Sequence, residues 1–235
     1  MKSKITFFVL FAFCVSFAVS FEKMERMSLS ADGIDSIVVD CGAGSLSIAG
    51  VESMRNIEVE AEIIVGGKRE RDLEKYVADN VRLELKKQGN RAILTSRFKN
   101  SFPKIGLRER KINLTVVVPK NMDVDVDDGS GDMKIENIEG NLQIGDGSGV
   151  VIIRGIVGDV DIEDGSGTID IRDVSGSVNI DDGSGTIEVN GIGRNVQVND
   201  GSGSIYIDGV EGDVIIKDDG SGSIRIQNVK GKVVK

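Results

Sequence analysis

The sequence predicts an all-β protein: a right-handed parallel β-solenoid of about six regular 18-residue coils, with a degenerate coil before them and an inserted short helix and hairpin. The first observation is the tetrapeptide Asp-Gly-Ser-Gly, which occurs six times, with five starts 18 residues apart and a last interval of 19. A fixed period of this size is typical of stacked structural units. The second observation is that short runs of alternating apolar and polar residues separate the copies, as one-sided strands require. The copies begin at Asp128, Asp146, Asp164, Asp182, Asp200 and Asp219.

Each repeat contributes five aliphatic residues to the expected interior. In residues 164–181 these are Ile169, Ile171, Val174, Val178 and Ile180. Burying five such side chains stabilises a coil by about 1.5–3 kcal/mol each. Ordering the backbone of the coil costs about 1–2 kcal/mol for every residue. One coil is therefore unstable alone, and we expect stability to arise only when the coils stack.

The turns between the strands recur as regularly as the strands. The residue after the first strand of each copy is Gly, Asn or Asp, which tolerate a left-handed backbone, so we expect a positive φ there. The column consists of Asn137, Gly155, Asp173, Gly191, Gly209 and Asn228. The extra residue of the last interval, near Lys217 and Asp218, should form a bulge or a longer turn outside the core.

The region 21–120 is expected to be a separate, less regular β-rich part in front of the repeat array at 121–235. Residues 41–51 fit the first half of the repeat, with Leu46, Ile48 and Val51 in core positions and Gly50 at the turn. Ile57 and Val59 then follow the pattern of the second strand of this degenerate coil.

Three further elements are expected before the array. Residues 68–80 have the apolar spacing of a short amphipathic helix, with Leu73, Tyr76 and Val77 on one face. Residues 81–85 and 92–98 fit a hairpin that turns at Gly89-Asn90. Residues 112–118 alternate as a strand that returns the chain to the solenoid.

The N-terminus has the pattern of an export signal at residues 1–20. Lys2 and Lys4 precede an apolar run from 5 to 19, and small residues at Ala18 and Ser20 predict cleavage before Phe21. The mature chain is therefore expected in the periplasm, at the cell surface or outside the cell, without an integral membrane span. Cys41 is then the only cysteine, which permits no intrachain disulfide and is expected to serve as a small buried hydrophobe.

The distribution of charge excludes several classes of function. Residues 21–120 carry 18 Lys and Arg against 15 Asp and Glu, while residues 121–235 carry 9 against 23, a net charge of −14. An acidic array does not bind nucleic acid, which needs a cationic face. The chain contains no His, and its acidic residues recur at every coil, whereas a catalytic pair should be singular. The sequence thus predicts neither an enzyme nor a bound cofactor, except for the calcium considered next.

The aspartates that begin the tetrapeptides are the candidate binding residues. Stacked coils place them about 4.8 Å apart, so their carboxylates would repel one another unless something relieves the repulsion. Either each aspartate accepts hydrogen bonds from the following amides in an Asx-type turn, or the column binds Ca²⁺ through hard oxygen ligands. The calcium candidates are Asp128, Asp146, Asp164, Asp182, Asp200 and Asp219.

A basic segment before the array is the candidate interaction patch. One interpretation is a solvated hairpin whose charges protect an edge strand. The other is docking to an anionic surface or polymer of the cell envelope. The ends of the solenoid leave end-to-end association open as well. The patch consists of Arg82, Lys86, Lys87, Arg91, Arg97, Lys99, Lys104, Arg108, Arg110 and Lys111.

Three motifs carry a family resemblance over roughly residues 34–235. They are Gly42-Ala-Gly-Ser-Leu-Ser-Ile48, the strand Ile112-Asn-Leu-Thr-Val-Val-Val-Pro119, and Val124-Asp-Val-Asp-Asp-Gly-Ser-Gly-Asp-Met-Lys-Ile135. With the exported N-terminus, they resemble the bacterial putative-adhesin family of β-strand-repeat proteins, a domain of unknown function. The resemblance implies an exported β-solenoid and lends no catalytic residues.

The sequence therefore favours an exported, non-enzymatic, adhesin-like structural or interaction module of the cell envelope. Two alternatives remain open at this point. One is a calcium-dependent binding module that uses the aspartate column. The other is a self-assembling envelope scaffold.

Overall fold

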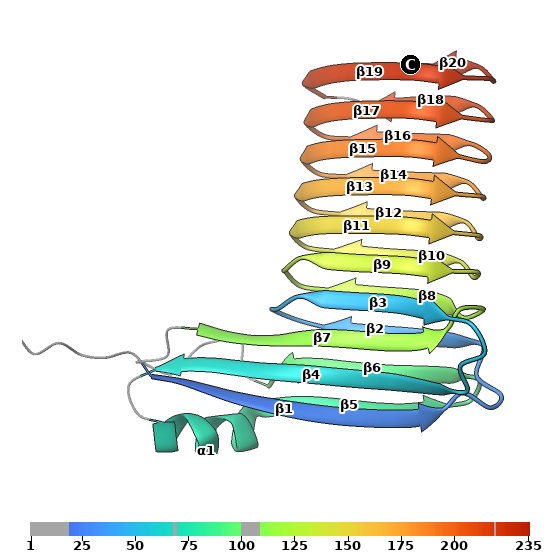
Figure 1. The fold of residues 1–235 in the computed structure, drawn as a ribbon. Helices are drawn as coiled ribbons and strands as arrows, with labels where there is room; N and C mark the ends of the chain where they lie inside the picture. The colour runs from blue at the N-terminus through green and yellow to red at the C-terminus, as the bar shows by residue number, and fades with distance from the viewer. Residues whose placement is uncertain (1–18, 68–69, 100–108, 219) are drawn as a thin grey trace, which may run out of the picture.

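The computed structural model describes residues 19–67, 70–99, 109–218 and 220–235. The chain forms two ten-stranded sheets that face each other and build a rod on a wider base (Figure 1). Sheet A has the order β1-β4-β7-β3-β9-β11-β13-β15-β17-β19. Sheet B has the order β20-β18-β16-β14-β12-β10-β8-β2-β6-β5. In the array, neighbouring strands of each sheet are every second strand of the chain, as a solenoid requires.

The regular coils alternate between the two sheets, one strand in each. Their strands in sheet A are β9 (Met133–Ile138), β11 (Gly149–Ile156), β13 (Gly167–Val174), β15 (Gly185–Ile192), β17 (Gly203–Val210) and β19 (Gly222–Val229). Their strands in sheet B are β8 (Asp123–Asp128), β10 (Leu142–Asp146), β12 (Val160–Asp164), β14 (Val178–Asp182), β16 (Val196–Asp200), β18 (Val214–Asp218) and β20 (Val233–Val234).

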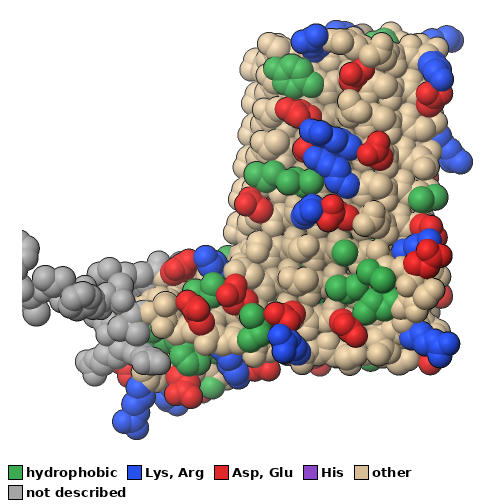
Figure 2. All heavy atoms as spheres, viewed as in Figure 1, with side chains coloured by type: hydrophobic (Ala, Val, Ile, Leu, Met, Phe, Trp, Pro, Cys, Tyr) green, Lys and Arg blue, Asp and Glu red, His purple; other side chains and the backbone are tan. Residues whose placement is uncertain are grey.

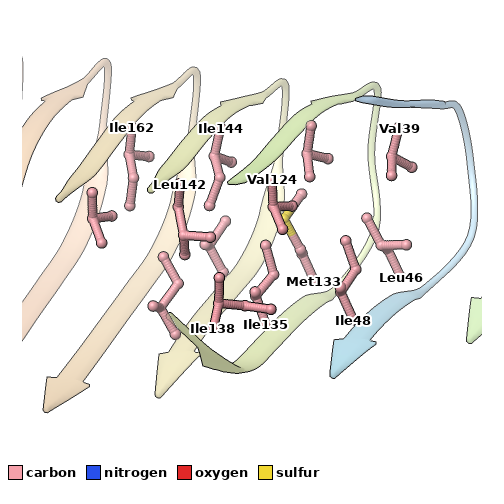
Figure 3. Close-up of a cluster of buried hydrophobic side chains, with 14 of the residues drawn as sticks. Val39, Leu46, Ile48, Val124, Met133, Ile135, Ile138, Leu142, Ile144 and Ile162 are labelled. Carbon is pink, nitrogen blue, oxygen red and sulfur yellow. The ribbon is translucent and has the colours of Figure 1, made fainter. Parts of the chain in front are cut away.

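Neighbouring coils pair in parallel, with each residue beside its equivalent in the next repeat. Ile169 pairs with Ile187 in sheet A, and Ile162 pairs with Ile180 in sheet B. The interior between the sheets is built from the predicted aliphatic columns, and Ile169, Ile171 and Ile180 are each no more than 1% exposed. Figure 3 shows side chains from several coils meeting between the two sheets. The predicted fold class is confirmed.

The predicted turn geometry is also confirmed. All six residues of the turn column have a positive φ, between 51° at Asn228 and 72° at Gly209. In the last interval, Val198 pairs with Ile216 and Asn199 pairs with Asp218, which leaves Lys217 as the extra residue of a bulge. Because Lys217 points away from the core, the aliphatic columns continue in phase past the insertion.

The wider base contains the predicted helix and hairpin. Helix α1 (Glu70–Asn80) buries Leu73, Tyr76 and Val77 against the core, while residues 68 and 69 of the expected helix lie outside the described residues. Strands β5 (Val81–Gln88) and β6 (Arg91–Phe98) form the hairpin, with Gly89 at φ 64°. Strand β7 (Glu109–Pro119) contains the expected returning strand. No helix within the described ranges is long and apolar enough to cross a membrane.

The degenerate coil is built differently from the prediction. Strand β3 (Leu46–Val51) is its half in sheet A, and Leu46 and Ile48 are buried as expected. Its half in sheet B is β2 (Ser36–Cys41), which precedes β3, and not the segment with Ile57 and Val59. Val51 is 44% exposed, and the positive φ lies at Ser53 rather than at Gly50.

The segment with Ile57 and Val59 belongs to a longer antiparallel strand. Strand β4 (Asn56–Gly67) pairs antiparallel with β1 (Val19–Ser30) on one side and with β7 on the other, all within sheet A. The assignment failed because alternation identifies a one-sided strand but does not tell whether its partner is parallel or antiparallel. Twelve alternating residues exceed what a coil can accommodate on one sheet.

The coil made of β2 and β3 lies between two pairs of strands that come later in the sequence, β6 with β7 on one side and β8 with β9 on the other. Strand β2 lies between β6 and β8, and β3 lies between β7 and β9, all in parallel. The chain therefore passes from β6 and β7 over an earlier coil to reach β8 and β9. This insertion joins the irregular base to the regular array through one continuous core.

The close stacking of glycine backbones gives the first testable prediction. A Cβ on Gly167, where φ is 148°, would lie 1.9 Å from the carbonyl oxygen of Gly149 in the preceding coil. Replacing Gly167 with Ala should therefore destabilise the protein by at least about 2 kcal/mol, through a backbone clash and an unfavourable φ. Chemical denaturation monitored by circular dichroism measures this.

Gly145→Ala is the matched control. Its Cβ would lie 3.9 Å from the nearest atom, the carbonyl oxygen of Val126, so we expect no loss of stability. A Gly167→Ala variant as stable as Gly145→Ala would show that the coils are not stacked as closely as described.

Candidate functional site

The tetrapeptide aspartates form a column along one inner corner of the solenoid. Each aspartate ends a strand of sheet B, in parallel register with the next, as Asp164 pairs with Asp146 on one side and Asp182 on the other. The inward direction follows from the alternation of the strand, since Leu142 and Ile144 face inward and Asp146 is the next residue of the same parity. The column members described by the structure are 1–6% exposed. They are Asp128, Asp146, Asp164, Asp182 and Asp200.

One oxygen of each carboxylate closes the tight turn that follows. The Oδ1 atom accepts a hydrogen bond from the amide of the serine two residues later, at 3.1 Å for Asp164 and Ser166 and at 2.9 Å for Asp200 and Ser202. Asp146 and Asp182 make the equivalent bond. This is the Asx-type turn that the sequence predicted, so the structural role of the tetrapeptide is confirmed.

The second oxygen of four of these carboxylates accepts no hydrogen bond. The Oδ2 atoms of Asp128, Asp146, Asp164 and Asp182 are buried without a hydrogen bond. Burial disfavours the charged form and, with the charges of neighbouring aspartates, raises the pKa of Asp146 to about 6. Burial likewise raises the pKa of Asp182 to about 6, and it raises the pKa of Asp128 and of Asp164.

The inward direction bears on the predicted calcium sites. Within the described ranges, no group of three or more acidic or cysteine side chains is placed to hold a metal ion. Asp219 lies outside the described residues. Calcium binding along the column therefore stays a prediction.

Cys41 occupies the column position of the degenerate coil. It continues β2 in register with Asp128 at the end of β8, is 5% exposed, and its Sγ donates a hydrogen bond to Asp128 Oδ1 at 3.3 Å. Burial, followed by the charge of Asp128, raises the pKa of the Cys41 thiol well above its usual range. A buried neutral thiol is a poor nucleophile, so the predicted packing role of Cys41 is the one that its surroundings support.

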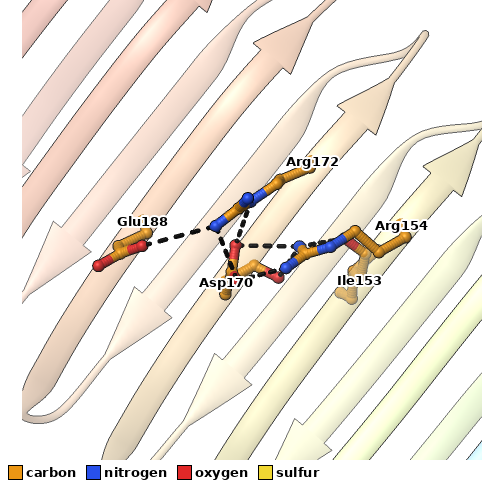
Figure 4. A network of polar contacts seen from close by, with 5 residues as sticks. All are labelled: Ile153, Arg154, Asp170, Arg172 and Glu188. Atoms are coloured by element: carbon orange, nitrogen blue, oxygen red, sulfur yellow. Dashed lines mark hydrogen bonds and ion pairs between the residues drawn. The ribbon is translucent and has the colours of Figure 1, made fainter.

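The outer face of sheet A carries ion pairs that cross from coil to coil. Arg154 forms a bidentate pair with Asp170 in the next coil, and Arg172 also donates to Asp170, with Nε 3.0 Å from Oδ1 (Figure 4). Arg172 extends the network to Glu188, 4.0 Å away. Figure 2, which views this side, shows Lys and Arg side chains mixed with Asp and Glu. The charges on sheet A therefore largely compensate one another.

The outer side of sheet B carries ladders of polar side chains instead. At the start of most sheet B strands of the array, a corner side chain accepts a hydrogen bond from the backbone amide one coil further on, as Asp123 Oδ1 does from Asn141 N at 2.7 Å. A second ladder runs along the strands, where Asn179 donates to Asp161 at 2.8 Å and accepts from Gln197 at 2.7 Å. The accepting side chains of the corner ladder are Asp123, Asn141, Asp159, Asn195 and Asp213.

A shallow groove of about 660 Å³ follows these two ladders across several coils. Carboxylates and carboxamides of β8, β10, β12, β14 and β16 line it, with Arg91 from β6 at one end. Sequence reasoning missed the corner ladder, although its signal was present. The 18-residue alignment also has a glycine column, and the residue directly after the glycine is Asn, Asp or Ser in four of its five copies. The glycines are Gly140, Gly158, Gly176, Gly212 and Gly231.

The structure divides the predicted basic patch between the two sheets. Six of its members, from Arg82 to Lys99, belong to the β5–β6 hairpin at the end of sheet B or to the residue that follows it. Arg110 and Lys111 lie on β7 in sheet A, where Arg110 packs 5.3 Å from the ring centre of Phe98. Lys104 and Arg108 lie outside the described residues.

Several members of the patch have local partners. Arg82 and Lys86 share Glu84, and Arg97 contacts both Asp40 and Asp127. Lys87 donates to the carbonyl oxygen of Asp32, Lys99 donates to that of Asp79, and Lys111 pairs with Glu109. Much of the positive charge is thus used within the molecule, and docking to an anionic polymer stays a prediction.

Comparisons with known proteins yield structural similarity alone. No protein-family model matches the chain, and no curated protein matches it. The solved structures similar to it include a putative lipid binding protein from Parabacteroides distasonis ATCC 8503, with 15% identity over 91% of this chain and 97% of that chain and a TM-score of 0.45.

Two other similar structures are a putative adhesin and a putative cell adhesion protein. A putative adhesin from Parabacteroides merdae ATCC 43184 is 16% identical over 91% of this chain and 97% of that chain, with a TM-score of 0.39. A putative cell adhesion protein from Clostridium sporogenes ATCC 15579 is 12% identical over 91% and 98%, with a TM-score of 0.34. At such low TM-scores these similarities carry no argument about function.

The raised pKa values predict how stability depends on pH. A carboxylate whose folded pKa is raised opposes folding when ionised, so its destabilising effect is relieved as the pH falls through the folded value of about 6. We expect the free energy of unfolding to increase between pH 7.5 and pH 5, by on the order of 1 kcal/mol for each buried aspartate after solvent screening. The melting temperature should rise with it. Below about pH 3.8 the trend should reverse, because Asp170, whose pKa is lowered from its ordinary value of 3.8, then becomes protonated and loses its arginine pairs.

Asp182→Asn tests the origin of this dependence. It keeps an oxygen for the Ser184 amide and removes one ionisable group, so it should flatten the rise in melting temperature. Asp181→Asn, an exposed neighbour that points outward, is the matched control and should retain the wild-type dependence. Identical pH profiles for Asp182→Asn and the wild type would contradict the assignment.

Proposed function

We propose that the protein is an exported, non-enzymatic β-solenoid that acts as a structural and interaction module of the cell envelope. Export is supported by the charged and apolar pattern of residues 1–20 and by the small residues that end it. A structural role is supported by the continuous core, which runs from the α1 helix through every regular coil up to β18. Such a core makes a stiff rod, because each coil packs against both neighbours.

The groove on sheet B is the observation that carries the interaction role. Its polar groups recur once per coil, and adjacent strands lie about 4.8 Å apart. Small-molecule sites enclose most of their ligand, whereas this groove is shallow and long. Its geometry suits an extended polymer of the envelope that lies along the rod and meets equivalent hydrogen-bonding groups at each step.

The non-enzymatic part of the proposal rests on how the acidic side chains are used. A catalytic site needs a few groups in a unique mutual geometry. Here the carboxylates repeat from coil to coil, and many serve turns or ladders, as Asp164 does for Ser166 and Asp159 does for Ser177. The hollow beside the buried aspartates repeats in the same way, because the same Asp-Gly corner of successive coils lines it, as at Asp146 and Asp164.

Export can be tested by expressing the full sequence in a bacterium and fractionating the cells. We expect to find the protein outside the cytoplasm. Intact mass spectrometry should give the mass of a chain that begins at Phe21. Leu10→Arg, which places a charge in the apolar run, should leave an uncleaved cytoplasmic chain. An uncleaved wild-type protein in the cytoplasm would contradict the proposal.

Envelope binding can be tested by co-sedimentation of the exported protein with isolated envelope polymers. Asn179→Tyr places a bulky side chain in the groove and should weaken binding at least about tenfold, or about 1.4 kcal/mol. Asn190→Tyr, at an exposed position of β15 on sheet A, is the matched control and should bind like the wild type. Equal binding by all three proteins, or none by the wild type, would argue against the groove.

A further inference from the structure

The charges on the outer face of sheet B are separated by sign along the rod. Apart from the corner residue Asp123, strands β8, β10, β12, β14 and β16 have ten outward positions, and none of them is Lys or Arg. Five of the ten are acidic, and we call these five the acidic stripe. The acidic stripe consists of Asp125, Asp127, Asp161, Glu163 and Asp181.

The opposite charge gathers at the end of the same sheet. Strands β5 and β6 present four cations outward, which we call the basic edge, and Glu84 is the one acidic residue among their outward positions. Outward positions follow from the pairing with β2, because Ala92 and Leu94 are buried beside the buried Ile37 and Val39. The basic edge consists of Arg82, Lys86, Arg91 and Arg97.

Most of the two groups lie too far apart to neutralise each other within one molecule. Strands β2, β8 and β10 separate β6 from β12, so Arg91 and Glu163 lie about 19 Å apart along the sheet. Exposed charges are screened over about 8–10 Å at physiological ionic strength. Only Arg97 reaches across, to Asp127 at 3.2 Å. The remaining charges keep a free side toward solvent.

Sheet A provides an internal comparison. Its outward charges of both signs are mixed and form pairs such as Lys134 with Glu136 at 2.7 Å, in addition to the network around Asp170 (Figures 2 and 4). The same solenoid thus supports a compensated face. The separation of charge on sheet B is a property of that face and not of the fold.

We propose that two copies of this chain pair through the outer faces of sheet B, antiparallel and about a two-fold axis, so that the basic edge of each copy lies on the acidic stripe of the other. A face with both signs at separate ends is complementary to itself under a two-fold axis that lies in the plane of the contact, at right angles to the rods. A purely basic partner would leave the basic edge without a role. The outward side chain of Val38, on β2 between the two charged groups, supplies apolar contact beside the axis.

The size of the face sets the strength of the pairing. Seven strands from β5 to β14, each about five residues wide, offer roughly 500 Å² from each copy. Stable complexes bury about 800 Å² from each partner, so this dimer is weak and depends on salt. Because the pairing covers the groove on sheet B, a bound polymer and a second copy exclude each other. The pairing itself does not rest on the proposed function.

Sedimentation equilibrium of the exported protein at low ionic strength tests the pairing. We expect the average mass to rise toward that of a dimer with concentration, and to return to that of a monomer at high salt. Two charge-reversed variants then test the surface. Lys86→Glu with Arg91→Glu reverses half of the basic edge, and Glu163→Lys with Asp181→Lys reverses part of the acidic stripe.

Each variant alone should associate at least about tenfold more weakly than the wild type, because its two copies then repel. A 1:1 mixture of the two variants should associate again, since one face is then acidic and the other basic. Lys134→Glu with Arg225→Glu makes the same change of charge at exposed positions of sheet A. This control variant should associate as strongly as the wild type.

Several results would overturn the proposal. A wild-type protein that stays monomeric at every soluble concentration in low salt would contradict the pairing. If that monomer binds polylysine, the acidic stripe serves a basic partner instead. Association that survives in both variants would place the contact elsewhere on the rod. If the separate variants show wild-type circular dichroism spectra but their mixture stays monomeric, the two charged groups do not meet.

Discussion

The parallel, in-register stacking of successive coils is the constraint on which the rest of the structure depends. It places every residue beside its equivalent in the neighbouring repeat, as Gly185 lies beside Gly167 and Ile187 beside Ile169. At the corners the backbones approach so closely that a Cβ on Gly185 would lie 1.9 Å from the carbonyl oxygen of Gly167. Interstrand hydrogen bonding, core packing and corner geometry are therefore satisfied together, or not at all.

Because of the same constraint, each side chain interacts with the equivalent side chains of both neighbouring coils. An aliphatic residue in an inward column packs on two others of its kind, which suits a continuous core. A charged residue in a column meets like charges on both sides. On sheet B this repulsion is reduced by carboxamides that alternate with carboxylates, as Asp161 is followed by Asn179 and Gln197. On sheet A it is reduced by arginines, as at Asp170.

The buried aspartate column is where the constraint is least well satisfied. Asp146, Asp164 and Asp182 each secure one corner by accepting a hydrogen bond from a serine amide, yet their second oxygen, like that of Asp128, is buried without a hydrogen bond. Burial of unpaired polar atoms costs stability, and like charges in the column add to this cost at neutral pH. The turn geometry that the aspartates fix is repeated at every corner, so the fold retains them at some expense in stability at neutral pH.

The sequence by itself determined every feature that is local and repeated. The period identified the coils, alternation identified Ile169 and Ile171 as core, and Asn137 or Gly155 marked the turns with a positive φ. These follow from the backbone preferences of single residues and from a two-residue period that needs no knowledge of the partner strand. The Asx turn at Asp164 also depends only on its next two residues.

Only the tertiary structure decided which strands are neighbours in the irregular base. Alternation is the same for parallel and antiparallel partners, so the sequence did not indicate that β4 runs antiparallel in sheet A or that β2 completes the coil of β3. The division of the basic residues follows from this pairing, since it sends Arg91 to sheet B and Lys111 to sheet A. Strand partners are chosen by contacts between residues far apart in the chain, which only the folded structure brings together.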